Sequence, residues 1–377
     1  MKKNKKIFVL ISSFPGSILS FRGELINAIQ MQGYQVHVVA PYMEKDLLGA
    51  LEACSIVVHQ ITLHRTGLNP LTDLASLYYI TKLLKAIKPE KVLSYTIKPV
   101  IYGSIAAKLS GVPAIYSLIT GLGYAFTGEA TGKRKVIQKI LRRLYKMALA
   151  MNKDVFFQNE DDKALFRKLD LIPVSLTPTV VNGSGINVEN FTVVPFNDTC
   201  DFLLIARLLA DKGVREYAQA AKRLKQTHPE ATCRLVGWID DNPDAIKQSE
   251  LNEWIDLGYI EYLGRKGDVK PSLSQCNVYV LPSYREGTPR TVLEAMAMGR
   301  PIITTDAPGC RETVIDGENG FLVAVKDSDA IYKCMVDFIE QQELIIKMGA
   351  KSRLVAEQKF DVHKVNYKML KTMGLLR

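Results

Sequence analysis

Short apolar runs alternate with segments of helical periodicity along almost the whole chain. In the first half, the helical segments include 21–32, which ends at Gly33, and 99–110, which ends at Gly111. This alternation predicts a parallel sheet of the α/β type. The predicted strands lie at residues 7–11, 35–40, 92–95, 114–118 and 154–158, and a last one begins at residue 179.

The alternation begins again after residue 200, which predicts a second doubly wound unit. The weakly patterned stretch 185–199 is the predicted linker. We expect a first domain over 1–190, a second over 191–360, and a C-terminal helix over 361–377 that is a candidate to cross back onto the first. Two such domains that face each other leave a cleft lined by the carboxyl ends of both sheets. The strands of the second domain are predicted at 201–206, 232–237, 261–263, 278–281 and 301–305.

The composition fits a soluble globular protein, with 377 residues, 47% of them hydrophobic and 23% charged. Its six cysteines are scattered, which favours reduced thiols over disulfides. The lysine-rich N-terminus precedes a short apolar run that we interpret as a strand, and no apolar stretch is long enough for a transmembrane helix. We therefore expect a cytoplasmic protein.

The net charge of +10 favours a nucleic acid, an anionic membrane surface or a phosphorylated substrate as partner.

Two glutamates, Glu286 and Glu294, flank the start of a predicted helix that follows the apolar strand 277–281. Thr288 is the expected N-cap and Pro289 the expected first helical residue. Glu286 then lies in the loop, and Glu294 lies about 7.5 Å along the helix axis. Free N–H groups at the helix start can bind a phosphate between them. The plainer alternative is that one glutamate is a helix-surface residue and the other a loop residue paired with Arg285 or Arg290.

Further cations lie at other strand ends of the predicted second domain. Arg207 ends its first strand and Lys212 follows in the loop, a placement that suits a diphosphate. The alternative is an ordinary surface pair in which Asp211 neutralises Lys212. Arg265 and Lys266 lie in a glycine-containing loop, 264–269, which we interpret either as a base-binding loop or as a plain turn.

A basic helix is predicted over 131–153, after the glycine-rich connector 119–128. One side of this helix carries an apolar stripe that we expect to pack on its own sheet. The basic face remains available for phosphates or anionic lipid head groups. The segment has no acidic residue, and its candidates for contact with a membrane surface are Lys133, Arg134, Lys139, Arg142, Arg143 and Lys146.

Other kinds of chemistry find little support in the sequence. There is no G-x-G-x-x-G or P-loop pattern, so dinucleotide-dependent redox chemistry is disfavoured. No metal site is expected, because the five histidines lack ligand spacing and Asp327 and Asp329 precede a helix, where Asp is a favoured cap. Ser/His/Asp and Cys/His arrangements are missing as well.

Several of these segments together resemble family 4 glycosyltransferases, which are retaining enzymes with the GT-B fold of two facing Rossmann-like domains. The resemblance is carried by A-R-L-L-A-D-K-G, G-R-K-G-D-V, L-P-S-Y-R-E-G-T-P-R-T-V-L-E and G-E-N-G-F-L-V. The first domain, with S-F-P-G-S-I-L-S-F-R, I-K-P-V-I-Y-G and T-G-L-G, is similar to a narrower group that extends undecaprenyl-diphosphate-linked sugars.

The resemblance implies a role for each matched position. Arg207 and Lys212 would bind the donor diphosphate, Glu286 the donor sugar and Glu294 the ribose. Members of the family typically need no metal, and the donor phosphate accepts the acceptor proton in a front-face attack, so no protein nucleophile is implied. The remaining donor-site candidates are Gly16, which would approach the phosphates when the domains close, with Arg265, Lys266, Gly287, Thr288 and Pro289.

On the acceptor side, the resemblance points to Lys98, Thr120 and Gly121. Many members carry a histidine, and some a glutamate, where this chain has Thr120, so a polar contact from that position to the donor sugar is open.

We expect a retaining transferase that moves a hexose or N-acetylhexosamine from a UDP-sugar to a polyprenyl-diphosphate-linked sugar in bacterial surface-glycan assembly, peripheral on the inner membrane face. The alternatives are a soluble acceptor, a sugar-nucleotide epimerase, or a nucleic-acid-binding protein, for which no recognised module appears.

Overall fold

The computed structural model describes residues 6–63, 70–122, 132–242 and 244–376. The chain forms two compact units, one from residues 1–184 with 365–377 and the other from 185–364. The chain therefore passes between the units twice, at 184/185 and 364/365, where we expected boundaries at 190/191 and 360/361.

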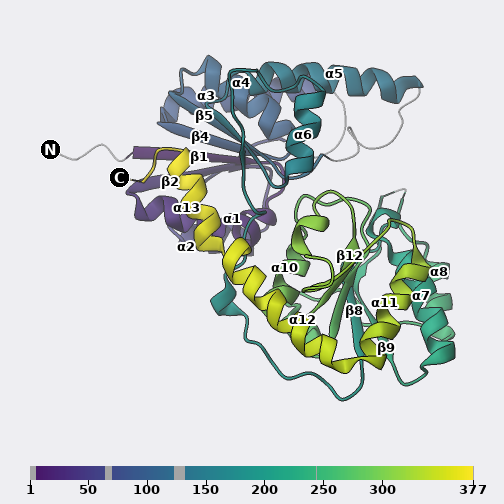
Figure 1. The fold of residues 1–377 in the computed structure, drawn as a ribbon. Helices are drawn as coiled ribbons and strands as arrows, with labels where there is room; N and C mark the ends of the chain where they lie inside the picture. Colours follow the sequence, from purple (N-terminus) through teal and green to yellow (C-terminus); the bar gives the residue numbers. More distant parts are fainter. Residues whose placement is uncertain (1–5, 64–69, 123–131, 243, 377) are drawn as a thin grey trace. The chain divides into compact units, whose positions relative to one another are not determined.

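The first unit contains a seven-stranded parallel sheet in the order β3-β2-β1-β4-β5-β6-β7. Its central strands are apolar along nearly their whole length because helices cover both faces (Figure 1), so both sides of each strand are buried. The strands are β1 (Lys6–Ser12), β2 (Tyr34–Ala40), β3 (Val57–Gln60), β4 (Lys91–Tyr95), β5 (Ala114–Ile119), β6 (Asp154–Phe157) and β7 (Thr179–Val180).

Six α-helices and most of a seventh cover this sheet in the described part of the first unit. The predicted single helix over 99–110 is in fact a π-helical turn, Pro99–Gly103, followed by a short α-helix. The α-helices are α1 (Ser17–Met31), α2 (Lys45–Ala53), α3 (Pro70–Ile87), α4 (Ser104–Leu109), α5 (Gly132–Leu149), α6 (Glu160–Lys168) and α13 (Val362–Thr372).

The C-terminal residues complete the core of the first unit. Val365 and Met369 of α13 and Met373 beyond it are buried in the same apolar cluster as strands β1, β2 and β4. The hydroxyl of Tyr116 on β5 donates a hydrogen bond of 3.2 Å to the carbonyl of Met373. The end of the chain is therefore an integral part of this unit.

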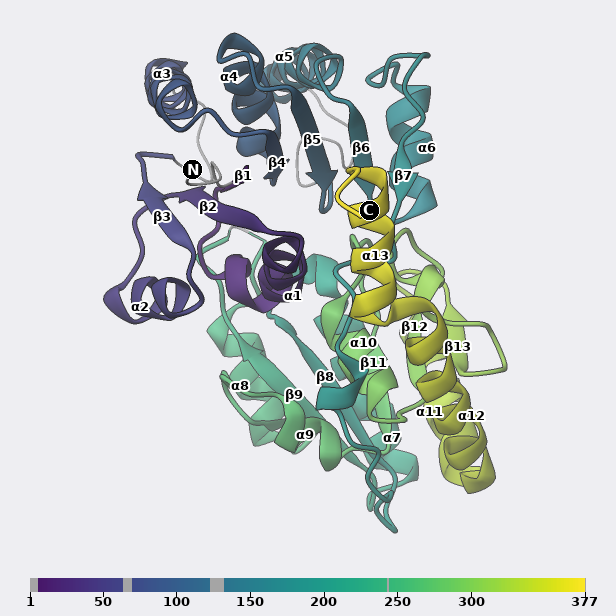
Figure 2. The same ribbon diagram turned by 90° about the vertical axis from the view of Figure 1, so that its left-hand side faces the viewer.

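The second unit repeats the same topology, with a six-stranded parallel sheet in the order β10-β9-β8-β11-β12-β13. Its strands are β8 (Asp201–Arg207), β9 (Thr232–Trp238), β10 (Glu261–Tyr262), β11 (Val278–Leu281), β12 (Ile302–Thr305) and β13 (Gly320–Val323). Its α-helices, all labelled in Figure 2, are α7 (Val214–Thr227), α8 (Gln248–Asp256), α9 (Lys270–Ser274), α10 (Arg290–Ala297), α11 (Ser328–Glu340) and α12 (Gln342–Val355).

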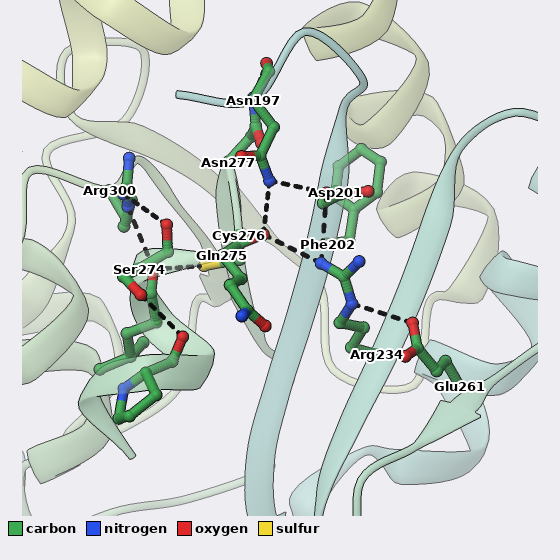
Figure 3. Close-up of polar contacts among 12 residues, drawn as sticks. Asn197, Asp201, Phe202, Arg234, Glu261, Ser274, Gln275, Cys276, Asn277 and Arg300 are labelled. Atoms are coloured by element: carbon green, nitrogen blue, oxygen red, sulfur yellow. Dashed lines mark hydrogen bonds and ion pairs between the residues drawn. The ribbon is translucent and has the colours of Figure 1, made fainter. Parts of the chain in front are cut away.

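A polar network ties together the amino ends of the strands in the second unit (Figure 3). Arg234 on β9 lies 3.2 Å from Asp201 at the start of β8 and 2.9 Å from Glu261 on β10. Nearby, the fully buried Arg300 donates to the carbonyls of Leu273 and Ser274, at the C-terminal end of α9. Burial lowers the pKa of Arg300. Structural contacts occupy the edge formed by the amino ends of the strands. A binding site is therefore expected at the loops that follow the carboxyl ends.

Each sheet reverses its strand order at one point, between β1 and β4 in the first unit and between β8 and β11 in the second. In open α/β sheets, ligands bind outside the carboxyl ends of the strands at this switch point, because the connections leave the sheet in opposite directions there. The predicted positions Lys212 and Glu286 follow β8 and β11 respectively. They therefore lie on the two sides of the switch point in the second unit.

Candidate functional site

Two loops meet at the switch point of the second unit. The loop after β8 forms a 3₁₀ turn, Ala210–Lys212, and ends at Gly213 with φ of 67°. The N–H of Tyr284, in the loop after β11, donates to the carbonyl of Asp211 at 2.8 Å. A Cβ atom on Gly213 would lie only 2.2 Å from the carbonyl oxygen of Pro282, so the close approach of the two loops requires glycine.

The side chains of Lys212 and Glu286 form an ion pair across these loops. The Nζ of Lys212 lies 2.5 Å from Oε1 of Glu286, and the hydroxyl of Ser283 donates to the same oxygen at 2.8 Å. Burial alone would lower the pKa of Lys212, but the Glu286 carboxylate more than offsets this effect, and the net pKa is raised. The site thus pairs a protonated ammonium group with a carboxylate beyond the carboxyl ends of β8 and β11.

A third loop, after β12, fixes the backbone of Glu286. The N–H of Glu286 donates to the carbonyl of Pro308 at 2.9 Å. Gly309 has φ of 80°, and a Cβ atom there would lie 2.1 Å from the Glu286 carbonyl oxygen. We did not predict Ser283, Pro308 or Gly309 as part of the site. Their position just after predicted strands was the only signal in the sequence.

Helix α10 begins one residue later than we predicted. Pro289 is its N-cap, with an extended backbone, and its carbonyl accepts from the N–H groups of Val292 and Leu293. The prediction of Thr288 as N-cap is therefore wrong: its hydroxyl donates to the carbonyl of Gly287 instead. Because the carbonyl of Pro289 is the first to accept a helical hydrogen bond, the helix starts at Arg290.

Glu294 lies inside α10 and is mostly buried. Burial raises its pKa, while Arg290, 2.9 Å away and one turn earlier, lowers it in part. From the sequence we considered Arg290 as a partner of the glutamate in the loop; the structure pairs it with Glu294 in the helix. The carboxylate is therefore held in one orientation near the start of the helix, at the same edge of the sheet as Glu286.

Arg207 and Arg265 lie on the neighbouring strand ends. Arg207 ends β8, and its guanidinium lies 3.0 Å from the carboxylate of Asp240, which follows β9. Arg265 is exposed and stacks 4.6 Å above the ring of Trp238. Lys266 beside it is also exposed. The structure thus gathers the cationic candidates at the carboxyl edge of β8 to β10, and adds Asp240 and Trp238, which we did not predict.

The switch point of the first unit is also polar. The hydroxyls of Ser13, after β1, and Thr96, after β4, lie 2.7 Å apart, and Thr96 has φ of 70°. Such a backbone is uncommon for a threonine. Gly16 is the N-cap residue of α1 in the loop that Ser13 begins. This edge therefore combines a strained turn with the predicted phosphate loop.

The acceptor-side candidates lie on neighbouring strand ends of the same sheet. Lys98 is buried, and its ammonium group lies 2.6 Å from Asp73 of α3, which also accepts a hydrogen bond of 3.0 Å from Tyr102. Thr120 and Gly121 follow β5 directly, and Gly121 has φ of 139°. Most of the glycine-rich connector, at 123–131, lies outside the described residues.

The predicted basic helix is α5, and most of its cations are exposed or partly exposed. The side chains of Lys133 and Arg134 lie outside the described residues. The prediction that the apolar stripe packs entirely on the sheet is wrong, because Ile140 and Met147 are 53% and 54% exposed. The sheet covers only the adjacent helix face, which includes Tyr145 and Ala148 and is buried.

Among the described residues, no helix is both long enough and apolar enough to span a bilayer.

Comparison with protein families shows two matches that follow one another along the chain. Residues 9–159 match the Glycosyl transferase 4-like family and residues 199–341 match Glycosyl transferases group 1. Among solved structures, Anabaena HepE in complex with UDP and glucose superposes with a TM-score of 0.78 at 18% identity, covering 98% of this chain and 100% of that one. A glycosyltransferase from Rickettsia africae gives a TM-score of 0.76 at 18% identity, covering 100% of both chains.

Three relatives match in sequence over most of their length. The N,N'-diacetylbacillosaminyl-diphospho-undecaprenol alpha-1,3-N-acetylgalactosaminyltransferase of Campylobacter jejuni is 28% identical over 353 residues, which are 90% of this chain and 91% of that protein. The UDP-Gal:alpha-D-GlcNAc-diphosphoundecaprenol alpha-1,3-galactosyltransferase of Escherichia coli is 26% identical, covering 75% of both chains. The capsular polysaccharide biosynthesis glycosyltransferase CapM of Staphylococcus aureus is 26% identical, covering 95% and 94%.

These matches confirm the predicted resemblance, including the narrower similarity to transferases that act on undecaprenyl-diphosphate-linked sugars. The two parallel sheets, the two family matches and the structural neighbours agree. The chain is a glycosyltransferase with the GT-B fold, formed by a glycosyl transferase 4-like domain followed by a group 1 glycosyl transferase domain.

Proposed function

We propose that this glycosyltransferase moves a hexose or N-acetylhexosamine from a UDP-sugar to a polyprenyl-diphosphate-linked sugar, with retention of configuration, in the assembly of a bacterial surface glycan. The observation that carries the proposal is the Lys212–Glu286 pair at the switch point of the second sheet, where a cation and a carboxylate can engage the two ends of a sugar diphosphate. The names of the Campylobacter and Escherichia relatives support the lipid-linked acceptor.

The donor is held by the loops of the second domain in this proposal. Arg207 and Lys212 bind the diphosphate, Glu286 the sugar hydroxyls and Glu294 the ribose. Positions 287–289 and the free N–H groups at the start of α10 add contacts to the phosphate. Arg265 and Lys266 border the uracil, beside the exposed Trp238. These groups lie at the carboxyl edge of the sheet, where Lys212 is paired with Glu286 and Arg207 with Asp240 in the absence of donor.

The reaction itself needs stabilisation of the leaving diphosphate more than a protein nucleophile. As the bond between the anomeric carbon and the phosphate oxygen breaks, negative charge grows on UDP, and the cations of Lys212 and Arg207 stabilise it. The acceptor oxygen forms the new bond on the same face of the sugar, and its proton passes to the departing phosphate. We propose that no metal takes part. Within the described ranges, no three His, Cys, Asp or Glu side chains group as a metal site.

The acceptor is bound by the first domain in this proposal, near Lys98, Thr120 and Gly121, with Gly16 at a phosphate. The charge of Lys98 is balanced by Asp73 at 2.6 Å, so its main effect is to hold the turn after β4 in place. Thr120 offers a hydroxyl where other members of the family have a larger polar side chain. A lipid-linked acceptor also requires access to a bilayer, and the basic helix α5 supports peripheral attachment at the inner face of the plasma membrane.

A panel of UDP-sugars tests this proposal. Each donor is incubated with undecaprenyl-diphosphate-linked monosaccharides and, separately, with the same sugars in soluble form. We expect one donor to give a lipid-linked product that is heavier by one sugar residue, while soluble acceptors react poorly. Transfer to soluble sugars alone, or conversion of the UDP-sugar without any acceptor, would overturn it.

A further inference from the structure

Helices α3, α4 and α5 lie side by side on one face of the first sheet, as Figures 1 and 2 both show. We call the outward face of these three helices the α3–α5 surface. Single exposed apolar side chains are normal on a protein, but here they gather on adjacent helices. They are Leu71, Leu74, Tyr78 and Tyr79 on α3, Leu109 on α4, and Val136, Ile140 and Met147 on α5, each more than half exposed.

Helix α3 is apolar on two opposite sides. Its inner side, with Ile80 and Leu84, is fully buried against the sheet. Its outer side carries Leu74, Tyr78 and Tyr79, which are 59%, 62% and 53% exposed. A helix that only covers a sheet needs one apolar stripe, with polar residues on the opposite side. Packing among the described residues of the first unit thus does not explain the outer stripe of α3.

Helix α5 presents apolar and basic side chains next to each other on its outer side. Val136, Ile140 and Met147 form an exposed ridge along the helix. The basic ridge beside it borders a groove of about 390 Å³, closed on its far side by Leu169, Asp170 and Leu171, with Asp170 paired to Lys146. The cations that line this groove are Lys135, Lys139, Arg142, Arg143 and Lys146.

The charge on the α3–α5 surface has a single sign. The sequences of the three helices contain one acidic residue, Asp73, and it is buried against Lys98 on the inner side. The outer side adds the exposed Lys82, Lys85 and Lys108 to the cations of α5. On these three helices, leucine, tyrosine and lysine are exposed and no carboxylate is, although Asp170 lies beside Lys146. This pattern matches the layers of an anionic bilayer, where aliphatic chains enter the acyl boundary, tyrosines lie at the interface and lysines reach phosphates.

We propose that the α3–α5 surface docks on an anionic bilayer. The outer stripe of α3 inserts among the lipids, and the basic ridge of α5 lies at their phosphates. The inference rests on the proposed function for its biological purpose, because a lipid-linked acceptor must be reached at a membrane. It goes further in assigning the attachment to α3 as well as α5. Attachment then has a hydrophobic part, which salt does not screen, and an electrostatic part, which salt does.

Vesicle flotation with the full-length protein separates these two parts. Vesicles of phosphatidylglycerol with phosphatidylethanolamine, and vesicles of phosphatidylcholine, are compared at about 0.1 M and about 1 M salt, where the Debye length falls from about 10 Å to about 3 Å. We expect tighter binding to the anionic vesicles at low salt and a residual binding at high salt. The variant Leu74→Gln/Tyr78→Gln/Tyr79→Gln should lower the residual partition coefficient at least about tenfold.

Two further variants make the comparison specific. Lys139→Gln/Arg143→Gln/Lys146→Gln should lose the preference for anionic vesicles but keep the residual binding. The matched control Met31→Gln/Tyr42→Gln/Val174→Gln removes three side chains of the same domain that are 74%, 78% and 93% exposed on other elements, and it should bind like the unaltered protein. If the α3 variant also binds like the unaltered protein, or if no binding survives high salt, the proposal is overturned.

Two other measurements distinguish membrane docking from dimer formation and from the proposed transferase activity. Light scattering after size exclusion tests whether the outer stripe of α3 joins two copies of this chain. If the unaltered protein is a dimer that does not bind vesicles, and the α3 variant is a monomer, the proposal is overturned. With a detergent-solubilised lipid-linked acceptor, the α3 variant should transfer sugar at the unaltered rate. Failure of the unaltered protein to transfer any sugar would refute the proposed function while leaving the vesicle result to stand.

Discussion

The ammonium group of Lys212 lies 2.5 Å from the carboxylate of Glu286, although 74 residues separate them in the chain. The pair bridges the loops that leave β8 and β11, the neighbouring strands between which the order of the sheet reverses. Gly213 allows these two loops to pack closely, and Gly309 allows the loop after β12 to pack against Glu286. The N–H groups of Tyr284 and Glu286 and the hydroxyl of Ser283 donate the hydrogen bonds that fix the arrangement.

Replacing Glu286 by Gln should reduce the transfer rate about a hundredfold or more, while the protein stays folded. The substitution keeps the shape of the side chain but removes the charge that orients Lys212 and that we propose binds the donor sugar. Turnover at saturating donor and acceptor is the measurement, with circular dichroism to verify folding. Glu318→Gln is a matched control, because Glu318 is a half-exposed glutamate paired with Lys351 in the same domain. A Glu286→Gln enzyme within a few-fold of the control would remove Glu286 from the active site.

The change Asp240→Asn should tighten the binding of UDP by about two- to fivefold. Asp240 holds the guanidinium of Arg207 at 3.0 Å, and a diphosphate has to compete with that carboxylate for the same donors. Arg207→Ala should have the opposite effect and weaken binding by about tenfold or more. Isothermal titration with UDP measures both. Glu261→Gln, which removes the carboxylate from an arginine at the far edge of the sheet, should leave the affinity unchanged. Weaker binding by Asp240→Asn would contradict the proposed competition.

Gly309→Ala should be far more harmful than Gly317→Ala, although both glycines have positive φ, 80° and 74°. A Cβ atom on Gly317 would meet nothing within 4 Å, so only the backbone strain of about 1–2 kcal/mol applies. A Cβ atom on Gly309 would lie 2.1 Å from the Glu286 carbonyl and would displace that loop. Misplacement of a substrate-binding loop by about 1 Å can cost about a hundredfold in rate. Equal activity of the two variants would show that the contact does not position Glu286.

The central strands of both sheets were predictable because helices bury both of their sides and leave near-continuous apolar runs. Strands β3 and β13 were missed because they are short edge strands in which polar or glycine residues interrupt the apolar run. Lys212 and Glu286 were predictable from motifs that follow strands. Their direct pairing was not, since the contact depends on backbone hydrogen bonds between loops far apart in sequence. The helix start at Arg290 depended on which of two adjacent residues, Thr288 or Pro289, supplies the first carbonyl, a choice that residue preferences do not decide.

Stability should fall as the pH drops below about 6.5 because of a histidine pair on the edge strand β3 and its neighbour β2 in the first unit. The Nδ1 of His37 lies 2.9 Å from Nε2 of His59. Burial lowers the pKa of both rings below the ordinary 6.5, and the neighbouring ring lowers that of His37 further. Between the folded pKa and 6.5 the unfolded chain binds more protons, so protonation favours unfolding; above that range the pair has no effect on the pH dependence.

Urea unfolding between about pH 7.5 and about pH 5 measures this dependence. His37→Val/His59→Val should flatten the decline, since valine suits a strand and does not titrate in this range. His363→Val, at an exposed position, should keep the decline of the unaltered protein. If the double variant loses stability with acid as steeply as the unaltered protein, other groups are responsible.

Acceptor-dependent release of UDP is the most direct measurement of the proposed activity. With the matching UDP-sugar and an undecaprenyl-diphosphate-linked sugar, we expect one UDP to be released for each lipid product that gains a hexosyl or N-acetylhexosaminyl residue in the anomeric configuration of the donor. Without the lipid-linked acceptor, release should be slow. UDP release that is indifferent to this acceptor, or a product with inverted configuration, would contradict retaining transfer to a lipid-linked sugar.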